Sequence, residues 1–298
     1  MQQRVTTGNA HLDRMLGGGL LPGTLTVVAG ATGIGKTQLG IGYLFGGCDQ
    51  EGNRGALLDL SARGDSQNHA GYVNQFFDVP WRSANPDQLP SGANNDWVFD
   101  LDQSLPDALA MLGYQGRRVV RDQLDAQQWD DWQRQVNRTL NQMIAFLYGH
   151  LVRGTRRFLI DGIEPLDRPE LSLQMDLFEY AYHRVIRREH DWVARDLLRQ
   201  DFRKFSAAVE THRYDHTQTA CLLLSTTPES MLDQLMERPL ADGDLAATAN
   251  TLIYMGKIRD GVHIRRGLYI AKHRGSACDD QVRTFEINDS GLNFQEER

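Results

Sequence analysis

The stretch GATGIGKTQ, residues 30–38, carries the strongest pattern in this sequence. It fits G-x-x-x-x-G-K-[ST] at every fixed position. An apolar, β-branched run precedes it at residues 24–30, and residues 35–45 continue with apolar residues at helical spacing. A strand that feeds a glycine-rich loop and then a helix is the context in which this pattern holds phosphate, because the loop amides and the helix N-terminus favour an anion.

The residue types in this loop suit a nucleoside triphosphate such as ATP with Mg²⁺. Glycines let the backbone wrap closely and direct N–H groups inward. Lys36 would reach the β- and γ-phosphates, and the Thr37 hydroxyl would ligate Mg²⁺. The predicted nucleotide-binding residues are Gly30, Ala31, Thr32, Gly33, Ile34, Gly35, Lys36, Thr37 and Gln38.

A second Mg²⁺ ligand is expected where a neighbouring strand ends, because Mg²⁺ prefers oxygen ligands and its bound waters need a carboxylate. The apolar run 158–160 leads directly into Asp161, which makes Asp161 the first candidate. Asp59 and Asp100 end two other predicted strands and are the alternatives.

Outward from the loop, apolar strands alternate with helices. Further strands are predicted at residues 54–60, 96–102, 156–161 and 219–227, and helices at 67–77 and 105–112. Such alternation predicts an α/β fold with an open, mostly parallel central sheet flanked by helices. Residues 250–287 alternate with period two around turns, which predicts antiparallel hairpins at one edge of the sheet.

Two polar stretches, 114–152 and 170–213, are predicted to be helical insertions. We find no internal repeat and no low-complexity linker, so residues 1–298 are expected to form a single domain. The stretch 170–213 carries eight basic and eight acidic residues. A balanced run is typical of a solvated face, with a partner-binding helix as the alternative.

The overall composition and charge argue against several classes of protein. A net charge of −7 and a pI of about 5.7 argue against a large surface that grips phosphates without sequence preference. Three widely spaced cysteines form neither a disulfide framework nor a zinc ligand set, so a reduced, cytoplasmic protein is expected. The N-terminus has no apolar signal region and no run approaches the roughly 18 apolar residues of a membrane span, so no membrane insertion is expected.

Motifs flank the loop on both sides. Upstream lie Thr7-Gly8, Leu12-Asp13, Leu16-Gly17-Gly18-Gly19 and Pro22-Gly23. Downstream lie Tyr269-Ile270-Ala271-Lys272-His273-Arg274-Gly275-Ser276, Phe285-Glu286-Ile287 and Gly291-Leu292. Together with the loop and Asp161, these motifs resemble the KaiC-like branch of the RecA superfamily of P-loop ATPases, which is also related to RadA.

This resemblance implies a RecA-like core and assembly into a ring, for instance a hexamer, or a filament, with ATP at subunit boundaries. In the family, the Lys and Arg of the tail motif reach the neighbour's γ-phosphate, and those positions are Lys272 and Arg274 here. Charge chemistry agrees, because two cations at i and i+2 on one strand face suit a polyanion. The alternative is a pair of solvated strand residues.

One departure concerns hydrolysis. After its second strand the family usually carries an adjacent Glu-Glu pair, one of which positions and activates the attacking water. In this sequence Ser61-Ala62 stands there, and neither residue is a general base for water at neutral pH. Removing such a group commonly costs about 10²–10⁴ in rate, whereas nucleotide binding rests on the loop and Mg²⁺. The acids that could substitute are Asp59, Asp65 and Glu164.

Three functions follow as hypotheses. The first is an ATP-dependent oligomeric switch or assembly ATPase with an unidentified protein partner and slow or absent hydrolysis. The second is an active RecA- or RadA-like ATPase in DNA recombination or repair. The third is a scaffold with a relic nucleotide site. Nucleic-acid binding is not favoured, because the segment 228–245 carries five acids and a single arginine and would repel phosphates.

Overall fold

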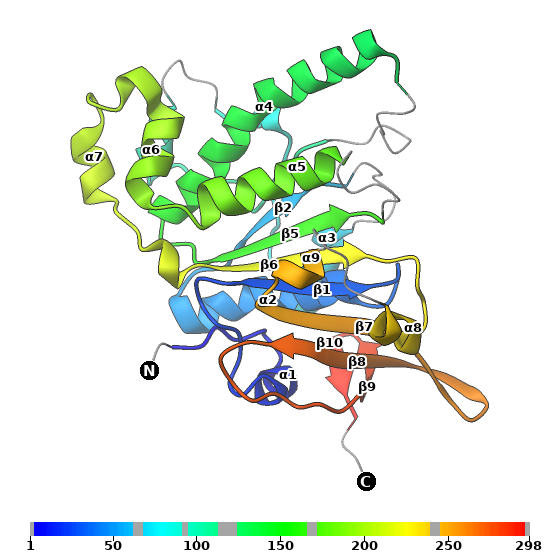
Figure 1. Cartoon of the computed structure of the whole chain (residues 1–298). Coiled ribbons are helices and arrows are strands. Elements are labelled where there is room, and N and C mark those ends of the chain that lie inside the picture. The colour runs from blue at the N-terminus through cyan, green and yellow to red at the C-terminus, as the bar shows by residue number, and fades with distance from the viewer. Residues whose placement is uncertain are drawn as a thin grey trace.

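A central sheet organises the molecule. The computed structural model describes residues 3–61, 68–90, 95–112, 124–165, 172–238 and 245–295, without the side chains of residues 135–138 and 246. Within these ranges ten strands form one sheet in the order β10-β9-β8-β7-β1-β6-β5-β2-β4-β3 (Figure 1). The strands are β1 (Leu25–Gly30), β2 (Ala56–Asp59), β3 (Ser83–Ala84), β4 (Ala108–Ala110), β5 (Arg157–Ile163), β6 (Ala220–Thr226), β7 (Thr251–Asp260), β8 (His263–His273), β9 (Arg283–Asn288) and β10 (Gly291–Phe294).

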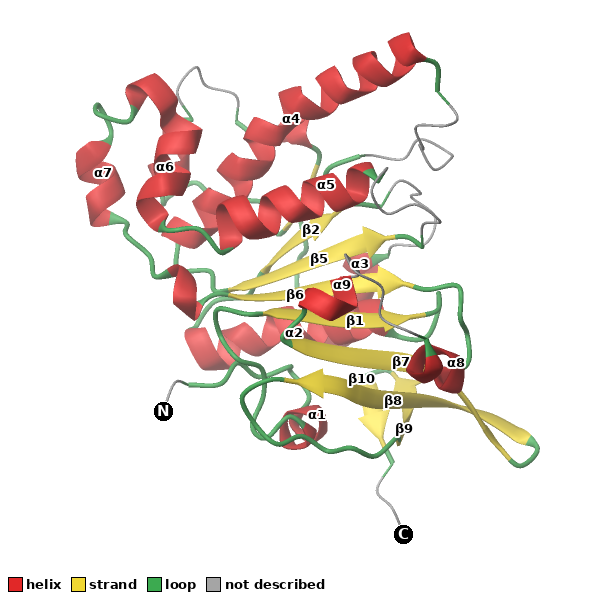
Figure 2. Ribbon diagram, in the orientation of Figure 1, coloured by secondary structure: helices red, strands yellow, loops and turns green. Residues whose placement is uncertain are grey.

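The strand directions confirm the predicted fold class. Every pairing from β3 across to β7 is parallel, whereas β7–β8, β8–β9 and β9–β10 are antiparallel. The antiparallel strands lie at one edge of the sheet, as the period-two pattern of residues 250–287 predicts (Figure 2).

Helices cover both faces of the sheet. The α-helices are α1 (Ala10–Met15), α2 (Lys36–Glu51), α3 (His69–Phe77), α4 (Ala126–Val152), α5 (Leu173–Glu179), α6 (His190–Leu198), α7 (Ser206–Thr211), α8 (Leu232–Glu237) and α9 (Leu245–Thr248). Shorter helical segments are η1 (Pro86–Gln88), η2 (Asp96–Phe99), the π-helix η5 (Tyr180–Ile186), η6 (Arg199–Asp201) and η7 (His216–Gln218).

Alternation along β1 shows how the two faces are filled. Val27 belongs to the core cluster that contains buried residues of α4, α5 and α6, whereas the next residue, Val28, belongs to the cluster that contains buried residues of α1, α2 and α3. A strand buried on both faces needs an unbroken apolar run, and β1 is buried at all six positions. This is why the run before the phosphate loop was recognisable in the sequence.

Two predicted elements are wrong. Residues 96–102, expected as a strand, form the short helix η2 and a turn. Residues 105–112, expected as a helix, contain β4, which pairs in parallel with β2. Trp97 and Val98 are buried beside α4, so their apolar pattern reports packing rather than a strand. A strand of three residues is too short for its period to be told from that of a helix.

The two predicted insertions are helical where they are described. Residues 113–123 lie outside the described part, and α4 follows with a capping box in which the Asp125 side chain accepts from the Gln128 backbone. The second half of α4, from Met143 onward, packs in the core. Residues 172–211 form α5, η5, α6, η6 and α7.

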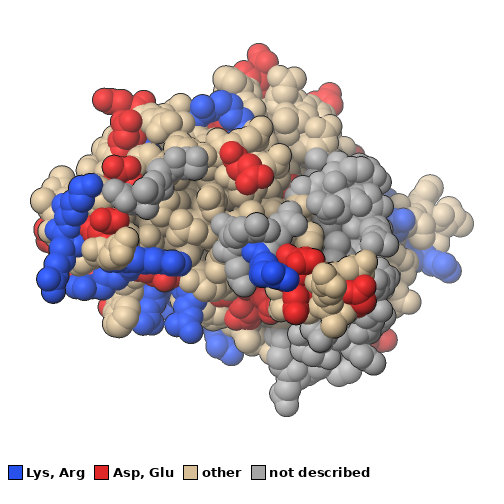
Figure 3. All heavy atoms as spheres, turned by 90° about the horizontal axis from the view of Figure 1, so that it is seen from above, with Lys and Arg blue, Asp and Glu red and all other residues tan. Residues whose placement is uncertain are grey.

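Positive charge gathers on the helical end of the molecule. Figure 1 shows α4, α5, α6 and α7 together beside β2 and β5. Figure 3 looks down on this end and shows Lys and Arg concentrated on the side where α6 and α7 lie. The exposed cations between η5 and α7 are Arg184, Arg187, Arg195, Arg199, Arg203 and Lys204. Exposed acids, among them Glu189, Asp196 and Glu210, lie in the same stretch.

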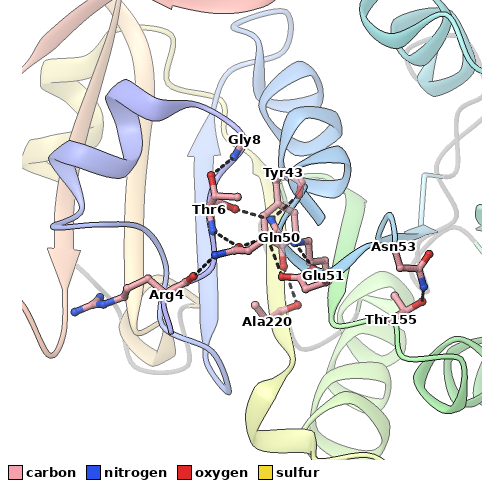
Figure 4. Close-up of polar contacts among 10 residues, drawn as sticks. Arg4, Thr6, Gly8, Tyr43, Gln50, Glu51, Asn53, Thr155 and Ala220 are labelled. Carbon is pink, nitrogen blue, oxygen red and sulfur yellow. Dashed lines mark hydrogen bonds and ion pairs between the residues drawn. The ribbon is translucent and has the colours of Figure 1, made fainter. Parts of the chain in front are cut away.

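A buried arginine fastens α2 to the sheet. Arg157, at the start of β5, is fully buried and makes a double hydrogen bond with the Glu51 carboxylate at 2.7 and 2.9 Å. It also donates to the backbone oxygens of Thr6 and Tyr43 (Figure 4). Because Glu51 ends α2 and the phosphate loop begins it, this cluster fixes the helix that carries the loop.

Candidate nucleotide site

The phosphate loop lies at the carboxyl edge of the parallel strands. Residues 30–35 join β1 to α2, and β1 lies between β6 and β7. Two strands away, β5 and β2 pair in a register that sets Asp161 beside Asp59. In open parallel sheets ligands bind outside the carboxyl ends of the strands, and this side of the sheet brings together Asp161 and Asp59, two of the acids that the sequence nominated.

Left-handed backbone shapes the loop. Gly33 and Gly35 have φ of +75° and +116°, which side chains with a Cβ rarely adopt. Gly35 is also the N-cap of α2, and no side chain caps this helix end. The first N–H groups of α2 therefore stay available to an anion, which is the property that a phosphate site requires.

Lys36 is folded back onto the loop. Its Nζ donates to the carbonyl oxygens of Gly30 and Ala31 at 2.8 and 2.9 Å, and the residue is 7% exposed. Burial lowers the pKa of Lys36 to about 8, against a smaller opposing effect of the Asp161 charge. The ammonium group thus lies inside the loop, where a phosphate chain would supply the negative charge that it lacks.

The loop and the strand ends fit ATP with Mg²⁺ on their own chemistry. Besides the uncapped start of α2, the Gln38 Oε1 atom is buried and has no hydrogen-bond partner among the described residues. Thr37 Oγ1 donates to Asp161 Oδ2 at 3.1 Å, so a hydroxyl and a carboxylate meet beside the loop. This pair would hold Mg²⁺, and the metal would neutralise charge on the phosphates.

His69, the first residue of α3, belongs to the same cluster and was missed in the sequence. Its Nε2 donates to Asp161 Oδ2 at 3.1 Å, and its Nδ1 lies 3.9 Å from Asp59 Oδ2. Only 6% of His69 is exposed. The one signal available beforehand was its place at the start of the helix that follows the second strand.

The charges in this cluster perturb one another. Burial acts to lower the pKa of His69, but its hydrogen bond to Asp161 and the charges of Asp161 and Asp59 outweigh burial and raise it. Burial raises the pKa of Asp59, with His69 and Ser61 opposing. The Ser61 backbone N–H donates to Asp59 Oδ1 at 2.8 Å. A buried histidine between two carboxylates is a feature of functional sites.

Close packing holds β2 and β5 together at this edge. Gly162 has φ of +97°, and a Cβ there would lie 2.2 Å from the Ser61 nitrogen. Gln174 of α5 donates to the carbonyl oxygens of both Leu60 and Gly162 at 2.9 and 2.8 Å. The position of Asp161 is therefore fixed by its neighbours in the chain as well as by its own contacts.

The other nominated acids are placed differently. Glu164 follows the end of β5 and is partly buried, with its backbone N–H directed at Gln174. Asp65 lies outside the described residues. Asp100 ends no strand, because residues 96–99 are helical, and its carbonyl accepts from Arg153 at the far end of α4. The expectation that Asp100 is an alternative metal ligand on a strand end is therefore wrong.

Lys272 and Arg274 lie on the side of the sheet where the parallel strands begin, opposite the side that carries the loop. β8 ends at His273, which pairs with Thr251 at the start of β7. Thr251 in turn pairs with Thr26, near the start of β1, whereas the loop follows the end of β1. These cations therefore do not reach the loop of their own chain.

Their immediate surroundings leave one cation exposed. Lys272 Nζ donates to the Ala247 carbonyl at 2.8 Å, and Arg274 is exposed. Burial, together with the neighbouring Arg274 charge, lowers the pKa of Lys272. Two close cations suit an outside anion.

A pocket of about 560 Å³ adjoins the loop tip. Thr32, Gly33 and Ile34 form one wall. The rest of its lining comes from β7, β8, β9 and the residue after β10, namely Lys257, Ile264, Arg265, Arg266, Thr284, Phe285, Glu286, Ile287 and Gln295. The loop is thus open to a ligand larger than phosphate on the side of the antiparallel strands.

Within the described ranges, no helix combines the length and the apolar character that crossing a bilayer requires. No curated protein matches the chain.

A family model described as "ATPase: KaiC" matches residues 5–65. The matched segment contains α1, β1, the phosphate loop, α2 and β2, and it ends just beyond Ser61-Ala62. Residues 5–65 are thus similar to the KaiC ATPase domain, which is part of the RecA-like P-loop ATPase superfamily, and the order and directions of the strands are consistent with a RecA-like fold.

Proposed function

We propose that this protein is an oligomeric switch that binds ATP with Mg²⁺ and hydrolyses it slowly or not at all. One contrast supports the proposal. The groups that would hold phosphate and metal, Lys36, Thr37 and Asp161, lie together, whereas Ser61-Ala62 follows β2 where the KaiC-like family carries its glutamate pair. Binding and cleavage depend on different groups, so the first can persist when the second is weak.

Residues of this chain would divide the work of binding. The loop amides and Lys36 would hold the phosphates, and Thr37 with Asp161 would hold the metal. The nucleoside would extend into the pocket beside the loop tip. Buried Arg157 would keep α2, and with it the loop, in place on the sheet.

The placement of Lys272 and Arg274 supports an oligomer. They lie on the side of the sheet where the parallel strands begin, and the loop lies on the side where these strands end. A head-to-tail arrangement would bring the cations of one copy to the nucleotide of the next, and such heterologous contacts generate rings or filaments. ATP would then link two subunits, and its concentration would set the assembly state by mass action.

The exposed cations between η5 and α7 give the switch a surface for its protein partner. All six are exposed on or next to η5, α6, η6 and the turn before α7, which lie together at the helical end of the molecule (Figure 1). A change in assembly state would multiply this surface and so strengthen partner binding through avidity.

The test is to measure ATP binding, phosphate release and mass by light scattering on one preparation. We expect Mg²⁺-dependent ATP binding, a larger mass with ATP, and turnover far below the usual range of about 1–10³ s⁻¹. Lys36→Ala, the control, should lose binding and assembly together. Turnover at ordinary rates that Lys36→Ala abolishes would sink the switch, and its stimulation by single-stranded DNA would favour the recombination alternative. No ATP binding would favour the scaffold.

A further inference from the structure

The end of β2 holds a histidine and a carboxylate where the sequence lacks the glutamate pair. Asp59 is the last residue of β2, and His69 opens α3. Their closest side-chain atoms, Oδ2 and Nδ1, lie 3.9 Å apart. This separation is too long for a direct hydrogen bond but short enough for both groups to contact one water.

These two residues adjoin the proposed metal end of the site. His69 Nε2 donates to Asp161 Oδ2, the same oxygen that accepts from Thr37. Asp59 is paired with Asp161 in the sheet register. Any water that His69 and Asp59 hold would therefore lie beside the groups that hold Mg²⁺ and the terminal phosphate.

We propose that Asp59 and His69 orient the attacking water in place of the missing glutamate pair. This inference rests on the proposed function, since it concerns the slow turnover of the same site. Asp59 supplies the acceptor for a water O–H, and the imidazole of His69 fixes the water from the other side. Both side chains are almost out of solvent, at 14% and 7% exposure, so their orientation is set before ligand binds.

The reaction balances without any further reagent. The water oxygen attacks the γ-phosphorus of ATP, and the bond from that phosphorus to the bridging oxygen breaks. The bond electrons stay on that oxygen, which gives ADP. The water proton passes to an oxygen of the transferred phosphoryl group, which leaves as dihydrogen phosphate. His69 and Asp59 position the water and keep their own protonation states, in the manner of a water-positioning residue rather than a base.

The variants separate this function from structural support of Asp161. His69→Gln puts an amide nitrogen near the place of Nε2 and so keeps a donor toward Asp161. His69→Leu keeps bulk but removes every polar contact. Asp59→Asn keeps the shape of the side chain and removes its charge. His183→Leu is the matched control, because His183 lies exposed on η5 away from this edge.

Three quantities are measured on the full chain: single-turnover hydrolysis, affinity for a non-hydrolysable ATP analogue with Mg²⁺, and affinity for ADP with aluminium fluoride. In His69→Leu and Asp59→Asn, we expect the rate and the aluminium-fluoride affinity to fall about 10- to 100-fold. The affinity for the ATP analogue should stay within about threefold, because interactions made only in the transition state are lost. His69→Gln should recover part of the rate, and His183→Leu should match the wild type.

Several results would overturn the assignment. One is wild-type protein that binds ATP but releases no phosphate even in a single turnover. Another is an equal loss of ATP-analogue affinity in His69→Leu, which would mean that His69 only supports Asp161. A third is a loss of rate in Asp65→Asn or Glu164→Gln while His69→Leu stays active. The proposed function fails differently, by absence of ATP binding or of any change in mass.

Discussion

Thr37 and Asp161 are 124 positions apart in the sequence, yet the Thr37 hydroxyl donates to the Asp161 carboxylate at 3.1 Å. The first follows β1 and the second lies in β5, with β6 between these strands in the sheet. Parallel strands have their carboxyl ends at one side of the sheet, so residues distant in sequence come together there. This hydrogen bond marks the place where phosphate and metal binding would meet.

Removing either member of this pair should uncouple ATP binding from Mg²⁺. In Thr37→Val or Asp161→Asn, we expect the affinity for ATP with Mg²⁺ to fall about 10- to 100-fold, toward the value measured in EDTA. Calorimetric titration of ATP with and without Mg²⁺ checks this. Asp100→Asn is the matched control, because Asp100 lies away from the strand ends. Full Mg²⁺ dependence in both variants would exclude the pair as the metal site.

Removing the two tail cations should weaken assembly but not the fold. In Lys272→Ala/Arg274→Ala, we expect ATP-dependent oligomers to be lost in sedimentation, because the cations of one copy would contact the nucleotide of the next. Arg259→Ala is the control for loss of a cation from the same hairpin, because Arg259 is exposed on β7 and does not line the pocket beside the loop. Mixing the double variant with Lys36→Ala should restore some mixed contacts, since one protein supplies cations and the other an intact loop. Unchanged nucleotide-dependent oligomers would show that the assignment is wrong.

The buried hydrogen bonds of Arg157 should dominate the free energy that holds α2 on the sheet. Arg157→Met leaves the largely buried Glu51 carboxylate without its partner, so we expect a loss of about 3–5 kcal/mol in unfolding free energy. Chemical denaturation measures it. Arg134→Ala, which breaks an exposed pair with Asp131, should cost about 0–1 kcal/mol. The double variant Arg157→Met/Glu51→Met should regain part of the loss, and failure to do so would point to packing instead of charge.

Stability should fall on acidification partly through His150. Burial lowers the pKa of His150 to about 4, against a smaller opposing effect of its hydrogen bond to the Pro106 carbonyl. The unfolded chain therefore takes up this proton first as pH falls, so the contribution of neutral His150 is complete above about pH 6.5 and lost toward pH 4. The protonation of His150 changes the free energy of unfolding by at most about 3 kcal/mol over this pH range.

His150→Gln isolates this contribution from the other acids and bases. We expect the variant to be less stable than wild type near pH 7, with the difference shrinking between pH 6.5 and 4. Denaturant unfolding at several pH values measures it. Parallel stability profiles for the two proteins would contradict the assignment.

The parts of the fold that were predictable share a physical property. β1, β2, β5 and β6 are buried on both faces, so each appears in the sequence as an unbroken apolar run near a turn. The phosphate loop was predictable because every group it needs lies within nine consecutive residues. The antiparallel edge was predictable from its alternation.

The two elements that were predicted wrongly owe their structure to contacts with other parts of the chain. β4 is a strand because β2 offers it a parallel partner, and residues 96–99 are helical because Trp97 and Val98 pack beside α4. Local pattern does not distinguish such short apolar stretches, since tertiary packing overrides propensity.

The sequence by itself determined that the chain has a phosphate loop, that an acid follows the apolar run 158–160 of another strand, and that no glutamate pair follows the second strand. Only the tertiary structure decided which side chains gather around that acid. It brought His69 of α3 between Asp59 and Asp161, and it set Lys272 and Arg274 at the far edge of the sheet. The reason is that motifs are local in the chain, whereas strand order and register, which place distant residues side by side, arise from burial of the whole sheet.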